Sequence, residues 1–60
     1  MTLKEQQLVH IDTDNEEWGR VAGNGTIEIV YEEDKEALVS IEVQGSFTGI
    51  LVPFNDIHPR

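Results

Sequence analysis

Three side chains near the start of the sequence have types that can bind a metal ion. His10, Asp12 and Asp14 occupy alternate positions, so they would share one face if an extended strand continued that far. Imidazole and carboxylate groups are common ligands of divalent metals. A solvated strand face that runs into a loop explains the same pattern without a metal, and we favour that interpretation.

The same segment has part of the spacing of a calcium-binding loop. Asp12, Asp14 and Glu16 match the first alternate ligands of an EF-hand. Glu17 stands where the sharp turn of that loop requires glycine, and Gly23 stands where the bidentate acid belongs. The EF-hand is therefore excluded, and only a weak, nonspecific calcium contact is left open.

The sequence also contains no recognisable set of catalytic residues. Ser40 and Ser46 lie in no nucleophile motif, and His58 precedes a proline near the end of the sequence. The absence of cysteine excludes thiol nucleophiles, iron–sulfur clusters and cysteine-based zinc sites. The Gly23-Asn24-Gly25 segment is too short for a phosphate-binding loop. We expect a non-enzymatic protein with no cofactor and no metal.

Charge is the strongest chemical feature of the chain. Twelve acidic residues against four basic ones give a formal net charge of -8, which disfavours direct binding to nucleic acid, because phosphate contacts need Lys and Arg. The acids gather in two runs, Asp12–Glu17 and Glu32–Glu36. This acidity either serves solubility alone or presents an anionic surface to a basic partner protein. The carboxylates proposed for that contact are Asp14, Glu16, Glu17, Glu32, Glu33 and Asp34.

A second feature is a group of apolar residues on faces that should point outward. In a regular strand, Val30 lies on the face opposite to Ile27 and Ile29, and Leu38 lies on the face opposite to Val39 and Ile41. Trp18 and Val21 likewise cannot both face inward. We expect Trp18, Val30 and Leu38 to form either a protein contact, including a homodimer, or a minor second core in a strongly curved barrel.

These residues are positioned by short β-strands. The chain has 60 residues, with 38% hydrophobic residues arranged in short runs, and turn signals recur at short intervals. We predict strands at residues 8–11, 18–22, 26–31, 38–43 and 47–52, a tight turn at Gly23–Gly25, one helical turn near 54–57 and a last extended piece at 58–59. Residues 1–7 are expected to be a frayed end or one helical turn.

Five short strands in so short a chain predict an all-β fold, a small five-stranded barrel that leaves few strand edges unpaired. We expect one domain over residues 1–60. Its most buried apolar residues should be Ile27, Ile29, Val39, Ile41, Val43, Phe47 and Leu51.

Residues 18–59 resemble SH3-like barrels of the KOW and Tudor type. The resemblance lies in Gly19-Arg20-Val21 followed by Gly25-Thr26-Ile27-Glu28-Ile29, and in the ending Gly49-Ile50-Leu51-Val52-Pro53-Phe54-Asn55-Asp56-Ile57. It implies the barrel, with a strand that runs into a proline, a one-turn helix and a closing strand. Peptide-binding SH3 domains have one residue fewer before this proline and a tyrosine where Asp56 stands. Their stacking aromatics are mostly missing here, which argues against proline-rich peptides as ligands.

The sequence as a whole predicts a cytoplasmic, acidic protein-interaction module. No apolar stretch is long enough to span a membrane. A small phage- or mobile-element-type inhibitor or accessory factor, which imitates nucleic acid toward a basic protein surface, is the first hypothesis. The alternative is a structural subunit or stabilising module of a larger complex, or a homo-oligomer.

Overall fold

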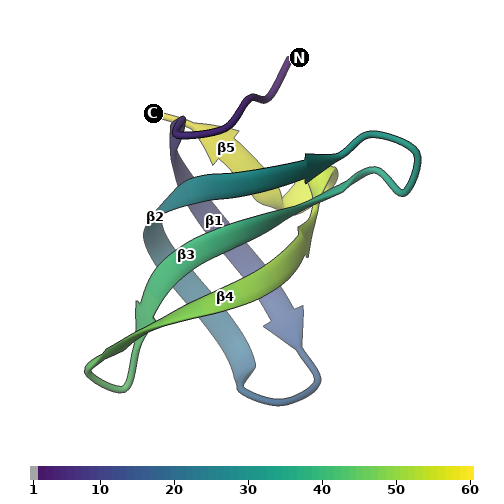
Figure 1. Cartoon of the computed structure of the whole chain (residues 1–60). Helices are drawn as coiled ribbons and strands as arrows, with labels where there is room; N and C mark the ends of the chain where they lie inside the picture. The colour runs from purple at the N-terminus through teal and green to yellow at the C-terminus, as the bar shows by residue number, and fades with distance from the viewer. Residues whose placement is uncertain (1) are drawn as a thin grey trace.

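Five antiparallel strands form a single sheet in the computed structural model, which describes residues 2–60. Their order in the sheet is β4-β3-β2-β1-β5, and the sheet folds over so that β1 and the start of β2 lie behind β3 and β4 (Figure 1). The predicted all-β class with five strands is confirmed, although the strands predicted at 18–22 and 26–31 form one strand and the extended piece at 58–59 is the fifth. The elements are β1 (Leu8–Asn15), β2 (Gly19–Tyr31), β3 (Glu36–Val43), β4 (Ser46–Pro53), the 3-10 helix η1 (Phe54–Asp56) and β5 (Ile57–Pro59).

The long strand β2 joins the two layers of the fold. Its first part pairs with β1 up to Leu8↔Thr26, and its second part pairs with β3 from Gly25↔Ile41 onward. The tight turn predicted at Gly23–Gly25 is therefore wrong, because the chain continues as one strand that bends there (Figure 1). Glycine is needed at this bend, since a Cβ at Gly25 would lie 2.7 Å from Val39 Cγ1 and 2.8 Å from the Ser40 carbonyl oxygen.

A β-bulge in β2 reverses which side chains face the core. Ile27 pairs with Val39, but Ile29 pairs with Leu38, so Glu28 is an extra residue in the ladder. A bulge of this kind shifts the inward and outward alternation by one position. Ile29 consequently points outward and is 39% exposed, whereas Val30 is half-buried against the core. The predicted faces of Ile29 and Val30 are therefore wrong.

Strand β4 also has the opposite face inward from the one predicted. Ile50 and Val52 are buried, while Leu51 is 51% and Phe47 is 79% exposed. The predicted burial of Phe47 and Leu51 is wrong, and Val43, also expected in the core, is only half-buried. The core predictions that hold are Ile27, Val39 and Ile41.

The rest of the core comes from the N-terminal segment and from all five strands. Beyond the three confirmed residues, it contains Leu3, Val9, Ile11, Val21, Ala37, Ile50, Val52 and Ile57. The N-terminal segment differs from the expected frayed end or helical turn, although Met1 lies outside the described residues. Leu3 is buried, the Gln6 N–H donates to the Ile27 carbonyl, and the Ile27 N–H donates to the Gln7 carbonyl.

The segment after β4 has the structure that its proline and apolar residues predict. Pro53 adopts an extended conformation and precedes η1, which confirms the single helical turn near residues 54–57. Ile57 then enters the core, and β5 pairs with β1 from Ile11↔Ile57 to Val9↔Pro59. This places β4 and β5 at the two outer positions of the sheet.

Candidate protein-contact surface

The first acidic run belongs to β1 and to the turn after it. β1 extends to Asn15, so Asp12 and Asp14 lie on its outward face, while Thr13 between them is buried. The side-chain oxygen of Asn15 accepts hydrogen bonds from the backbone N–H groups of Glu17 and Trp18, at 2.8 and 2.9 Å. This local hydrogen bonding, typical of Asx turns, fixes the turn that carries Glu16 and Glu17.

The alternate side chains considered for a metal do share a strand face, but each has another neighbour. The Arg20 Nη2 donates to Asp12 Oδ2 at 2.7 Å across the β1–β2 ladder, and His10 Nδ1 lies 3.1 Å from Asn24 Oδ1. Among residues 2–60, the structure contains no group of three His, Cys, Asp or Glu side chains arranged to hold a metal ion. Asp14 is exposed and lies opposite Arg20 in the same ladder.

A surface hollow brings the first acidic turn next to strands β3 and β4. Its volume is about 440 Å³, and we call it the acidic hollow. Its carboxylates come from the β1–β2 turn and from the first residue of β3, and its apolar wall comes from the end of β4. The residues lining it are Asp14, Asn15, Glu16, Glu17, Glu36, Leu51 and Pro53. Four acidic residues therefore line an opening that also has an apolar wall.

Apolar side chains continue from this hollow across the outside of the sheet. Ile29, Leu38 and Leu51 lie side by side, because Ile29 pairs with Leu38 and Leu38 pairs with Leu51. Leu38 leans over Gly49, where a Cβ would lie 3.3 Å from Leu38 Cδ1. Residues two or four positions along a strand share a face, which adds further members to this group. We call the group the outer apolar face, and its members are Ile29, Tyr31, Leu38, Phe47 and Leu51.

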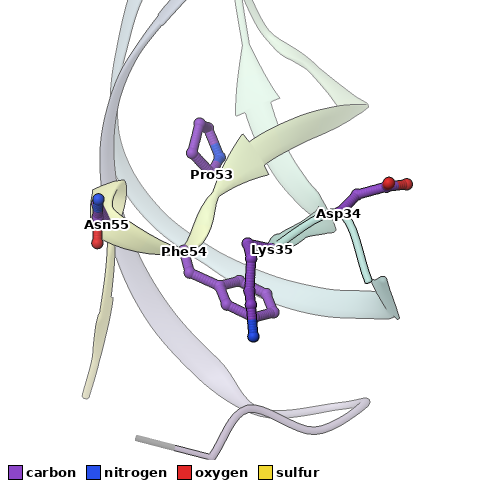
Figure 2. Close-up of a pocket in the computed structure, with 5 residues that line it drawn as sticks. All are labelled: Asp34, Lys35, Pro53, Phe54 and Asn55. Carbon is purple, nitrogen blue, oxygen red and sulfur yellow. The ribbon is translucent and has the colours of Figure 1, made fainter. Parts of the chain in front are cut away.

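The second acidic run forms a separate site at the β2–β3 turn. The Lys35 N–H donates to the Glu32 carbonyl and the Lys35 carbonyl accepts from the Phe54 N–H at 2.9 Å. A hollow of about 390 Å³ lies here, lined by Asp34, Lys35, Pro53, Phe54 and Asn55, and Figure 2 shows the Lys35 side chain alongside the Phe54 ring. The lysine places a positive charge within this site, so it is less acidic than its sequence indicates.

The β1–β2 turn and the β2–β3 turn, which carry the two acidic runs, lie at different ends of the molecule (Figure 1). Only Glu36, at the start of β3, reaches the acidic hollow beside Asp14, Glu16 and Glu17. The structure thus brings together one part of the predicted carboxylate set. Glu32, Glu33 and Asp34 belong to the other turn.

The predicted apolar contact residues are also separated by the fold. Leu38 lies at the centre of the outer apolar face, but Trp18 and Val30 are half-buried and pack against the core. Sequence reasoning missed Glu36, Phe47 and Leu51 as surface candidates. Phe47 and Leu51 were missed because both faces of β4 carry apolar residues, so the sequence does not show which face points outward.

Comparison of the chain with protein-family models, with curated proteins and with solved structures returned no match in any of the three. Within residues 2–60, no helix has the length and apolar character needed to cross a membrane.

Proposed function

We propose that this chain is a non-enzymatic, cytoplasmic interaction module that binds a protein with a basic surface, and that the acidic hollow is its contact site. The observation that carries the proposal is the position of four carboxylates around exposed Leu51 and Pro53. A partner that inserts Lys or Arg among the carboxylates also covers apolar surface, so it gains both electrostatic attraction and hydrophobic burial.

The grouping of four acidic residues around one hollow supports this assignment over that of a surface built only for solubility. The net charge of -8 attracts a basic partner over long range, and such steering raises association rates by about 10–1000-fold at low ionic strength. Closely spaced carboxylates also resemble a row of phosphates. A partner whose basic surface otherwise holds nucleic acid therefore fits, as expected for a phage- or mobile-element-type inhibitor or accessory factor on an SH3-like barrel.

The experiment uses a short peptide in which Lys and Leu alternate, with a Glu and Leu peptide as its control. The Lys peptide should shift the backbone amide signals of residues 14–17, 36 and 51, and its affinity should fall as salt rises toward about 0.5 M, because salt screens exposed charges. The Glu peptide should shift none of these signals. Binding that is indifferent to salt would count against the proposal.

A matched pair of variants locates the contact. The first changes Asp14→Asn, Glu16→Gln, Glu17→Gln and Glu36→Gln, all lining the acidic hollow. The second changes Glu5→Gln, Glu32→Gln, Glu33→Gln and Asp34→Asn, which removes the same charge from other places. We expect the first to weaken binding at least tenfold and the second to weaken it by no more than about threefold. Equal losses would show that total charge, rather than the acidic hollow, attracts the peptide.

A second candidate function, a structural subunit or stabilising module of a larger complex, is favoured by the outer apolar face. Phe47 and Leu51 are more than half exposed, and exposed apolar patches of this kind mark contact surfaces. Such a partner would cover Phe47 and Leu51 without requiring basic residues, so its affinity would not fall as salt rises.

A further inference from the structure

Strand β4 is an outer strand without charge. It pairs with β3, and the sheet of residues 2–60 has no strand on its other side. Its sequence, Ser46–Pro53, contains no Asp, Glu, Lys or Arg, although 27% of the chain is charged. Natural proteins usually protect such edges with charged side chains, bulges or a covering segment. Here proline protects only the last position of β4.

Among residues 2–60 the outer edge of β4 is unpaired, and it also carries exposed apolar side chains. Phe47 is 79% exposed, the largest value among the exposed large apolar residues, and Leu51 is 51% exposed. Both belong to the outer apolar face, which reaches the edge of the sheet at β4. A strand added to this edge would therefore gain backbone hydrogen bonds and would cover apolar side chains at once.

The distribution of charge indicates which strand of a second copy can pair with the β4 edge. β1 carries Asp12 and Asp14, β2 carries Arg20 and Glu28, and β3 carries Glu36 and Glu42. Two copies of a chain with net charge -8 repel each other, so they approach most easily where neither presents a charge. Among the four long strands, β4 alone meets this condition.

We propose that two copies of this chain form a homodimer by antiparallel pairing of their β4 edges. The pairing is isologous, because the same strand serves on both sides. It uses Ser46–Ile50, since the acidic turn of the same chain lies beside Leu51 and Pro53. The proposal does not rest on the proposed function, because it uses the β4 edge and not the carboxylates of the acidic hollow.

The size of this interface predicts a weak dimer. A buried aromatic side chain covers about 150–250 Å², so Phe47 and its neighbours from two copies bury less than the roughly 1,200 Å² of a stable complex. Dimerisation should therefore become visible as the chain concentration rises toward the order of 1 mM. Higher salt should tighten the dimer, because it screens the repulsion between two acidic copies.

The experiment is sedimentation equilibrium over that concentration range, with a matched pair of variants. Phe47→Lys removes the exposed aromatic ring at the β4 edge and places a charge there. Leu8→Lys makes the same charge change at another exposed apolar residue, on β1, which β2 and β3 separate from β4. Both variants reduce the overall repulsion equally, so overall charge alone would tighten both dimers.

We expect Phe47→Lys to raise the dissociation constant at least tenfold and Leu8→Lys to change it by less than threefold. Backbone amides within residues 46–50 should exchange with deuterium more slowly as the concentration of the unmodified chain rises. Three results would overturn the proposal: a monomer at all concentrations in low and high salt, equal loss in both variants, or protection confined to residues outside β4. Open-ended aggregation in place of a dimer would also contradict the two-fold pairing.

Discussion

Replacing Gly25 with alanine tests the close approach of β2 to β3 at the bend of β2, where the sheet folds into two layers. A Cβ at this position would lie 2.7 Å from Val39 Cγ1 and 2.8 Å from the Ser40 carbonyl oxygen. Ordinary contact begins near 3.4 Å, so Val39 Cγ1 must move by about 0.7 Å and the Ser40 oxygen by about 0.6 Å. Val39 is fully buried, and the oxygen belongs to the backbone of β3, which is paired on both sides by β2 and β4, so neither can move alone.

The magnitude follows from this overlap. Added volume in a packed core costs about 1–3 kcal/mol, and more where backbone must shift. Alanine also restricts the unfolded chain, which stabilises the protein by about 0.4–1 kcal/mol. We expect Gly25→Ala to lower the free energy of unfolding by about 3 kcal/mol. A chain of this length has a total of about 3–9 kcal/mol, so the variant is marginal or unfolded.

Gly49→Ala is the matched control, because it makes the same change on another strand. The new Cβ would meet only the Leu38 side chain, at 3.3 Å from Cδ1, and that side chain lies on the outer face, where it can rotate. Its stability should stay within about 1 kcal/mol of the unmodified chain. Urea unfolding of dilute protein, followed by the fluorescence of half-buried Trp18, measures both. An unchanged free energy of unfolding in Gly25→Ala, or equal losses at both glycines, would refute the close approach of β2 to β3 at Gly25.

Two further predictions concern the core and the acidic turn. Ile41→Ala should lower the free energy of unfolding by about 2–5 kcal/mol, because it leaves a cavity at a residue that is 3% exposed; a loss below about 0.5 kcal/mol in urea unfolding would contradict its place in the core. Asn15→Ala removes the acceptor of two backbone N–H groups, so it should lower the free energy of unfolding by about 1 kcal/mol and speed amide exchange at Glu17 and Trp18. Unchanged exchange would show that the turn forms without the Asn15 side chain.

The fold class was predictable because strand length and turn spacing are local properties. The strand at residues 38–43 shows this best, because apolar and polar residues alternate there. Val39 and Ile41 are indeed buried in the structure, and Glu42 is exposed. The single helical turn was similarly predictable, since Pro53 ends the preceding strand and begins an irregular segment.

The path of β2 could not be predicted from the same local signals. Asn24-Gly25 is a strong tight-turn signal, yet here Asn24 pairs with His10 in the ladder and Gly25 makes room for β3. The contact of Gly25 with β3, which is distant in the sequence, overrides the local preference for a turn. The bulge at Glu28 has the same character, because nothing in the Ile27-Glu28-Ile29 sequence indicates that an extra residue interrupts the alternation.

The errors of register and the candidate contact surface have one physical origin. In β4, Ile50, Leu51 and Val52 are consecutive apolar residues, so the strand is equally apolar on both faces and alternation cannot choose between them. The packing partners on the facing layer make that choice, and the resulting core takes Ile50 and Val52. A domain of this size has too little interior to bury both sets, because small folds bury only about 60% of their surface. The set that is left out, Phe47 and Leu51 with Ile29 and Leu38, must face solvent or a partner. Ile29, Phe47 and Leu51, which the sequence pattern assigned to the core, are therefore the residues that, with Leu38, make the outer apolar face available for binding.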